Sequence, residues 1–197
     1  MTAGARLLAD IRRIADADAR RTHFIGSILA SRSLVDGDEE LMLIDGQRRV
    51  ITLTLLVAAL RQVVRESDAG LARELTSILE HPRIPDRTRV RPHRTGVTFL
   101  EGLVFDRPVS TADLEMTLYD ENYAYFLAEV ADDAHRVWQG LQRLEHVTVT
   151  LREHANPQQV FESMNATGAP LRSDELIHNY VLMGLTHAQQ TEIEDGY

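Results

Sequence analysis

Cysteine is absent from the 197 residues, which excludes disulfides, thiolate metal sites and cysteine nucleophiles. No apolar run approaches the roughly 20 residues that a membrane-spanning helix needs. The longest candidate, Val50 to Leu60, is interrupted by Thr52 and Thr54. The N-terminus also lacks the charged start, apolar centre and small-residue cleavage site of a signal peptide. We therefore expect a cytoplasmic protein that has no membrane partner.

Positive charge is scarce, because 30 acidic residues face 21 lysines and arginines and give a formal net charge of -9. A protein that coats nucleic acid by charge alone needs a basic face to neutralise phosphates. Nucleic acid is therefore disfavoured as a bulk partner, although a local basic patch stays compatible with this composition. Hydrophobic residues make up 44% of the chain, which is ordinary for a soluble globular domain.

Hydrophobic periodicity predicts the elements of the first third of the chain. Apolar residues recur at helical spacing from Leu7 to Ala15. Two short strands are expected at His23–Leu29 and Leu41–Ile44, joined through an acidic turn at residues 36–40. The following segment, Gln47 to Arg65, is apolar on nearly all sides, which is typical of a central helix.

The rest of the chain is predicted to be mainly helical. Three prolines forbid a continuous helix between Glu80 and Arg94. An apolar stripe from Tyr123 to Leu141, which includes Trp138, predicts a helix that begins at Asn122 and packs in the core. A strand follows at His146–Leu151, and further helices are expected from Asn156 and from Ser173.

These elements predict a mainly helical α+β fold with a small sheet. We divide it into a core with the Asp-Gly-Gln-Arg-Arg turn (residues 1–66), a helix and basic-loop insertion (67–121) and a helical part (122–197). The third part is assigned to the same domain as the core.

The best candidate for a functional site is the turn from Asp45 to Arg49, between a strand and the central helix. Gly46 allows a tight turn that exposes the first N–H groups of the helix, whose positive dipole end favours phosphate. Arg48 and Arg49 add guanidinium groups that grip phosphate oxygens in pairs. Asp45, Arg49 and Thr52 are about one helical turn apart and share a face.

A purely structural interpretation competes with this one. Asp45 can be a plain helix N-cap. Arg48 and Arg49 can be solvated or paired with Glu39 and Glu40. On these residues alone the structural interpretation ranks first, because one glycine beside two arginines is a weak motif.

Four blocks, in order, resemble the domain of unknown function 262 family, which includes the nucleotide-hydrolysing part of GmrSD-type modification-dependent restriction systems. The blocks are His23-Phe-Ile-Gly-Ser-Ile-Leu29, Ile44-Asp-Gly-Gln-Arg-Arg-Val-Ile-Thr-Leu53, Phe161-Glu-Ser-Met-Asn-Ala-Thr-Gly-Ala-Pro-Leu171 and Glu175-Leu-Ile-His-Asn-Tyr-Val-Leu-Met183. The second is similar to the family's Asp-Gly-Gln-Gln-Arg signature, and the third to its Phe-Glu-x-Leu-Asn-x-x-Gly-x-Pro-Leu block.

The resemblance implies a ParB/sulfiredoxin-like core whose strand–turn–helix binds nucleotide phosphates. It implies catalytic roles for Asp45 and Arg49, and it implies Mg²⁺ together with GTP or another NTP. A nuclease subunit or domain is the implied partner. The nucleotide-binding residues expected from the turn and the resemblance together are Gly46, Gln47, Arg48, Arg49, Thr52, Asn165 and Gly168.

The chain departs from the family pattern in several places. Arg48 replaces the second glutamine of the signature, Ile51 replaces its first threonine, and Glu175 replaces an aspartate. We also expect a core that lacks two parts of the family: an N-terminal Gln-Arg segment and a C-terminal His-Asn-His-type nuclease domain. The alternative function is therefore a catalytically silent binding or assembly module that needs a partner chain to complete its site.

Other polar features have two interpretations each. Asn165 and Gly168 either contact nucleotide or end a helix. Asn179 is expected to pin the nearby loop by hydrogen bonds. The arginine-rich segment Arg83–Arg94 is interpreted as mobile and solvated, with contact to nucleic acid as the alternative. The eight histidines show no close metal-ligand spacing, and His178 and His187 are interpreted as a surface and a cap residue.

Overall fold

The computed structural model describes residues 3–18, 20–35, 38–92, 94–108, 114–152, 155 and 160. These residues form the expected mainly helical α+β fold. Within them no helix is both long and apolar enough to cross a membrane. The helices predicted from Asn156 and Ser173 lie outside the described residues. The elements are α1 (Ala3–Ala15), β1 (His23–Val35), β2 (Asp38–Asp45), α2 (Gln47–Val64), α3 (Ala69–Leu79), α4 (Arg94–Val104), α5 (Leu114–Glu129), α6 (Ala134–Leu141) and β3 (Leu144–Leu151).

The chain divides into two compact units, and each is assembled from separate stretches of sequence. Unit 1 comprises residues 1–25 and 47–145, and unit 2 comprises residues 26–46 and 146–197. Among the residues that the structure describes, the helices α1 to α6 belong to unit 1, whereas most of the sheet belongs to unit 2.

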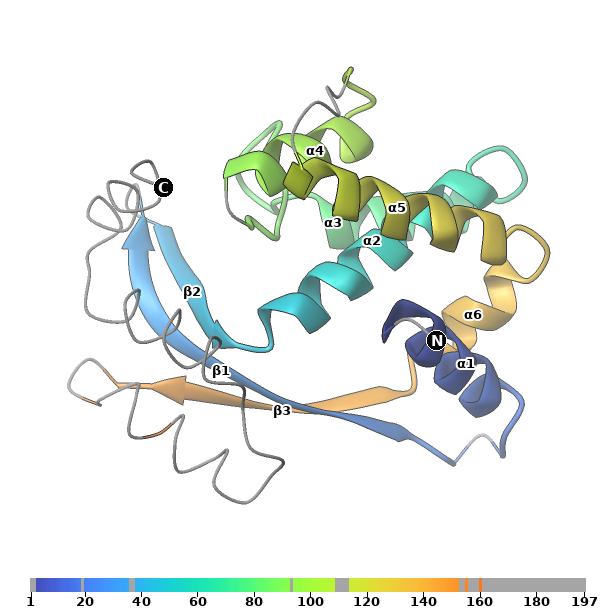
Figure 1. Ribbon diagram of the computed structural model, residues 1–197, viewed down its shortest axis with the longest axis horizontal. Helices are drawn as coiled ribbons and strands as arrows, with labels where there is room; N and C mark the ends of the chain where they lie inside the picture. Colours follow the sequence, from blue (N-terminus) through green and yellow to red (C-terminus); the bar gives the residue numbers. More distant parts are fainter. Residues whose placement is uncertain are drawn as a thin grey trace. The chain divides into compact units, whose positions relative to one another are not determined.

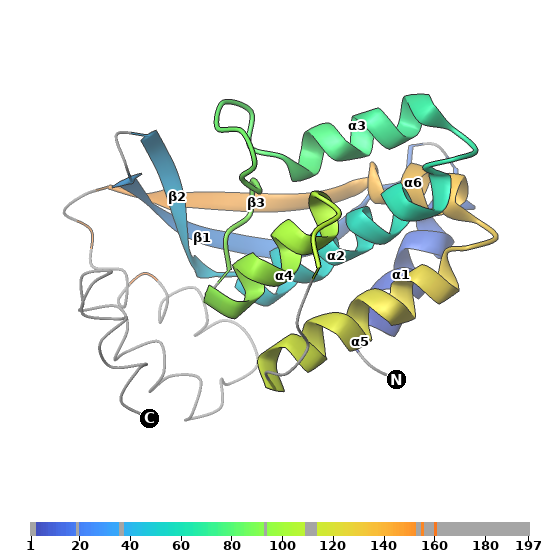
Figure 2. The same cartoon turned by 90° about the horizontal axis from the view of Figure 1, so that it is seen from above.

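Helix α2 is the centre of unit 1, as its apolar sequence predicts. Every residue from Leu55 to Arg61 is buried, and α2 lies between α3 and α5 (Figure 2). The α2–α3 corner is closed by Asp68, whose side chain accepts hydrogen bonds from the N–H groups of Gly70 and Leu71, both at 3.0 Å. The hydrogen bond from Leu71, joined by one from His135, lowers the pKa of Asp68 and keeps this cap ionised.

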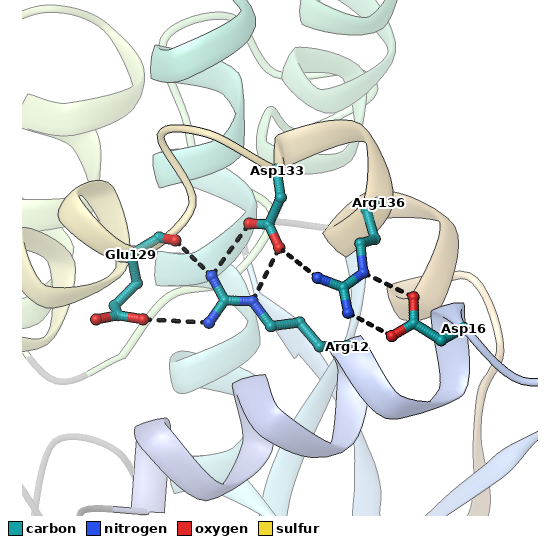
Figure 3. Close-up of polar contacts among 5 residues, drawn as sticks. All are labelled: Arg12, Asp16, Glu129, Asp133 and Arg136. Carbon is teal, nitrogen blue, oxygen red and sulfur yellow. Dashed lines mark hydrogen bonds and ion pairs between the residues drawn. The ribbon is translucent and has the colours of Figure 1, made fainter.

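Ion pairs that the sequence pattern did not indicate connect helix α1 to α6 and to the end of α5 (Figure 3). The Arg12 guanidinium donates to Asp133 at 2.9 Å and to Glu129 at 3.1 Å. Arg136 bridges Asp133 and Asp16, and its hydrogen bond lowers the pKa of Asp16. Two arginines and three carboxylates therefore form one chain of alternating charge along this contact.

Unit 2 is built on a three-stranded sheet in the order β2-β1-β3 (Figure 1). Strands β1 and β2 form an antiparallel hairpin, in which Arg32 pairs with Leu41 and carries an ion pair to Glu39 at 2.6 Å. Leu29 and Leu151 are the buried centre of this unit within the described residues. Partly buried apolar residues pack against them, namely Ile44, Val149, Ala155 and Val160.

Several predicted element boundaries are wrong. The helix expected from Asn122 to Leu141 is two helices, α5 and α6, separated by a turn at residues 130–133. The apolar stripe nevertheless continues across the turn, because Phe126, Val130 and Val137 all enter the same core. Helix α4 was not predicted.

The hairpin strands are also longer than expected. The acidic turn expected at residues 36–40 is wrong for residues 38–40, because they belong to β2. Cross-strand pairing of Ser33 with Glu40 and of Leu34 with Glu39 supplies the backbone hydrogen bonds for this extension.

Candidate functional site

A β-bulge ends the hairpin just before the predicted site. Ala30 pairs with Leu43 and Leu29 pairs with Asp45, so Ile44 is an extra residue on β2. A bulge of this kind bends its strand and re-aims the side chains beside it. Ile44 packs against the buried cluster of Leu29 and Leu151, which anchors the bulge in unit 2. Asp45 therefore lies at the end of β2, directly after an irregularity in the strand pairing that the sequence pattern did not indicate.

Gly46 occupies the connection from β2 to α2 for two independent reasons. Its φ of +91° lies in the left-handed region that side chains strongly disfavour. A Cβ atom at this position would also lie 3.2 Å from Cγ1 of Ile28 and 3.5 Å from the carbonyl oxygen of Ser27. The predicted need for glycine at this turn is therefore confirmed, and the backbone here passes close to β1.

The first turn of α2 carries positive charge and no acidic residue. The helix begins at Gln47, so the N-cap position belongs to Gly46, which has no side chain to accept from the first N–H groups. Interpretation of Asp45 as the N-cap does not match this boundary. Arg48 is exposed and Arg49 half-buried, and both follow directly in the first turn.

Thr52 lies one turn further along α2, as its spacing predicts. Its hydroxyl donates to the carbonyl oxygen of Arg48 at 2.7 Å, and Thr54 donates in the same way to Val50 at 2.8 Å. A hydroxyl whose proton is committed to the helix backbone can accept a hydrogen bond but does not donate to phosphate. Thr52 would need another rotamer to serve as a phosphate ligand.

The structure brings five predicted site residues together simply because they are consecutive, from Asp45 to Arg49. Glu39, one suggested partner for the arginines, is paired with Arg32 instead. Asn165, Gly168 and Asn179 lie outside the described residues, as do His178 and His187. Within the described part of the chain, no group of three or more His, Asp or Glu side chains is arranged to hold a metal ion.

Arg61 is a buried cation that directly follows the apolar run from Val50 to Leu60. The residue is 8% exposed, and its side chain donates to the carbonyl oxygens of Leu103 and Val104, both at 2.6 Å. It thereby satisfies the last carbonyls of α4, and Asp106 lies 3.7 Å away. An arginine directly after ten mostly apolar residues was the available signal, since such a position is expected to be buried.

The segment around the turn is included in a match to a known family. The family is described as GmrSD restriction endonuclease, N-terminal domain, and its model matches residues 5–182. No curated protein and no solved structure matches the chain. The family match spans nearly the whole chain, including the Asp-Gly-Gln-Arg-Arg turn.

Proposed function

The chain belongs to the GmrSD restriction endonuclease N-terminal domain family, and from this premise we propose that it binds nucleoside triphosphate within a DNA-modification-dependent restriction or phage-defence system. GTP is the preferred candidate ligand, because the four sequence blocks of this chain resemble the nucleotide-hydrolysing part of such systems. We also propose a ParB/sulfiredoxin-like core, in which the strand–turn–helix from β2 to α2 is the phosphate site.

The observation that carries the proposal is the passage through Gly46 into the first turn of α2. A left-handed glycine directly precedes a helix whose first turn holds Arg48 and Arg49 and no carboxylate. Helix N-terminal N–H groups and the helix dipole attract phosphate, and guanidinium groups bind its oxygens in pairs. The helix N-terminus and the two guanidinium groups both attract negative charge at this turn, which supports an anionic ligand over a cation.

Asp45 is the carboxylate closest in sequence to these arginines. Mg²⁺ is commonly bound by one or two carboxylates together with substrate phosphates, so a single aspartate fits an ion that arrives with the nucleotide. Asp45 would then hold the ion or its water, while Arg49 and the helix N-terminus hold the phosphates and Arg48 assists. When bound, the ion neutralises phosphate charge. A nuclease subunit or domain is the proposed partner.

Substitution of Arg49 tests the phosphate assignment. We expect Arg49→Ala to weaken binding of GTP or ATP about ten- to a hundredfold, because a hydrogen bond to a charged group contributes about 1.5–3 kcal/mol. Isothermal titration calorimetry measures the dissociation constants. Arg73→Ala is the matched control, since Arg73 is an exposed helical arginine of the same unit whose Nε donates to its own helix at Ala69. Unchanged affinity in Arg49→Ala would refute the phosphate site.

Phosphate release measured with and without Mg²⁺ distinguishes the two functions. Mg²⁺-dependent release that Asp45→Asn abolishes, with binding retained, supports an NTPase. Tight binding without any release supports the alternative, a catalytically silent binding or assembly module. Absence of nucleotide binding in a protein with an intact circular dichroism spectrum would overturn both forms of the nucleotide proposal.

A further inference from the structure

The segment between α3 and α4, residues 80–92, has a fixed backbone conformation; we call it the basic loop. Glu80 and Thr88 form an antiparallel bridge. The N–H of His81 donates to the carbonyl of Arg87, and the N–H of Arg89 donates to that of Leu79, both at 2.8 Å. Thr88 is only 2% exposed and donates from its hydroxyl to Val90. The expected mobile, solvated loop is therefore tied down by backbone contacts at its base.

His81 holds the tip of the basic loop from within. Its Nδ1 accepts hydrogen bonds from the N–H groups of Arg83, at 3.2 Å, and Ile84, at 3.0 Å. The His81 side chain therefore caps the turn by accepting from two consecutive backbone N–H groups. Pro82 and Pro85 further restrict the backbone. A loop ordered before binding loses little conformational entropy when a ligand arrives.

The charge of the basic loop is opposite to that of the chain as a whole. Its 13 residues contain four arginines (residues 83, 87, 89 and 91) against two carboxylates, although the complete chain has a formal net charge of -9. One of those carboxylates, Asp86, is ion-paired with Arg107 at 3.1 Å, which adds a fifth guanidinium to this surface. Arg83, Arg89 and Arg91 are exposed.

The arginines of the basic loop have different local roles. Arg89 donates to the carbonyl of Ser77 at 3.0 Å and so closes the C-terminal end of α3. Arg87 is half-buried, with its Nε fully covered. Arg83 and Arg91 stand on either side of this anchored centre in the sequence and are both exposed. Their exposure places their charge where a ligand can reach it.

We propose that the basic loop contacts the phosphate backbone of duplex DNA. Guanidinium groups spaced along a rigid loop match a ligand with regularly repeated phosphates, and backbone contacts of this type position a protein on DNA without reading its sequence. The family to which the chain belongs is that of a restriction endonuclease, which acts on DNA. Because the complete chain has a formal net charge of -9, the rest of the chain adds no general attraction for DNA.

The contact is tested by fluorescence anisotropy with a labelled DNA duplex over a series of salt concentrations. We expect the double variant Arg83→Gln/Arg91→Gln to bind at least tenfold more weakly at low salt. Its slope of log affinity against log salt should be smaller by about two, since each neutralised phosphate contributes about 0.9. The matched control is Arg20→Gln/Arg21→Gln, which removes the same charge from two exposed residues in the α1–β1 connection. That connection lies far from the basic loop in both views (Figures 1 and 2).

The proposal is supported if only the loop variant loses affinity while its circular dichroism spectrum and melting temperature stay unchanged. Equal losses in both double variants would show a general charge effect and overturn it, as would undetectable binding of duplex DNA at low salt. Binding of a polyglutamate peptide as tightly as of DNA would identify an acidic protein partner instead. Arg49→Ala should retain full DNA binding, so failure of the nucleotide site and failure of the basic loop are separate results.

Discussion

Gly140 shows at the scale of one residue how closely α6 approaches α1. A Cβ atom on Gly140 would overlap the carbonyl oxygen of Ile11 and lie 3.0 Å from the Cγ2 of the same residue. Both contact points belong to the buried core, since Gly140 and Ile11 are buried. The absent side chain at this position therefore sets the separation of the two helices.

We expect Gly140→Ala to lower the free energy of unfolding by about 1–3 kcal/mol, because the added methyl group forces the two helices apart. Differential scanning calorimetry measures this as a lower melting temperature. Gln139→Ala, at the exposed neighbouring position on α6, serves as the control and should change stability little. A melting temperature for Gly140→Ala equal to that of the control would show that α1 and α6 adapt without cost.

At the scale of elements, α1 is attached to the remainder of unit 1 by both apolar and ionic contacts. Leu8 and Ile11 are buried, while Arg12 on the neighbouring face reaches Asp133 and Glu129. At the end of the helix, Arg143 donates to the carbonyls of Ile14 and Ala17. Hydrophobic burial is not directional, so the ionic contacts are suited to setting the register of α1 on α6.

A double-mutant cycle on Arg12→Met and Asp133→Asn measures the coupling across this contact. We expect a coupling energy of about 1 kcal/mol, at the upper end for ion pairs, because both side chains are partly buried and the guanidinium binds in two places. The cycle is read from urea unfolding at low and high salt, and screening should reduce the coupling. The pair Asp10–Arg13, in which the Arg13 side chain is exposed, is the control, with an expected coupling of no more than about 0.5 kcal/mol. Equal coupling in the two pairs would contradict this account.

Element types were well predicted where local pattern suffices, but their ends were not. The run of apolar residues in α2 indicated both a helix and its central burial, and both are confirmed. The break between α5 and α6 was missed because the apolar period continues across it. The bulge beside Asp45 was missed for another reason. The register of the hairpin depends on which residues of β1 and β2 pair, and the sequence of one strand does not specify this pairing.

At the scale of the whole molecule, the two units differ in how much of their described part is buried. Unit 1 has a large apolar core around Leu56, Leu75 and Phe126, whereas two buried residues, Leu29 and Leu151, centre the described part of unit 2. Several apolar side chains of the hairpin are exposed, including Leu34 and Leu41. Segments with few buried apolar contacts open locally at a lower free-energy cost. The free energy of local opening is therefore expected to vary along the chain.

Hydrogen–deuterium exchange followed by mass spectrometry tests this difference. We expect amides in residues 55–60 of α2 to exchange most slowly, at the rate of global unfolding, and amides in residues 39–42 of β2 to exchange faster through local opening. Comparison within one experiment provides the control, because solution conditions are then identical for both segments. Equal protection of the two segments would mean that the hairpin opens only when α2 unfolds.

The sequence by itself determined the helical character of most of the described chain, the central position of α2 and the need for glycine at residue 46. These features depend on hydrophobic period and backbone conformation, which act over a few neighbouring residues. Tertiary structure alone decided the burial of Arg61 against α4, the close approach at Gly140 and the fixed conformation of the basic loop. The first two depend on partners distant in sequence, and the basic loop depends on hydrogen bonds across six to ten residues. Hydrophobic period indicates none of these contacts, because each is made between particular atoms only after the chain has folded.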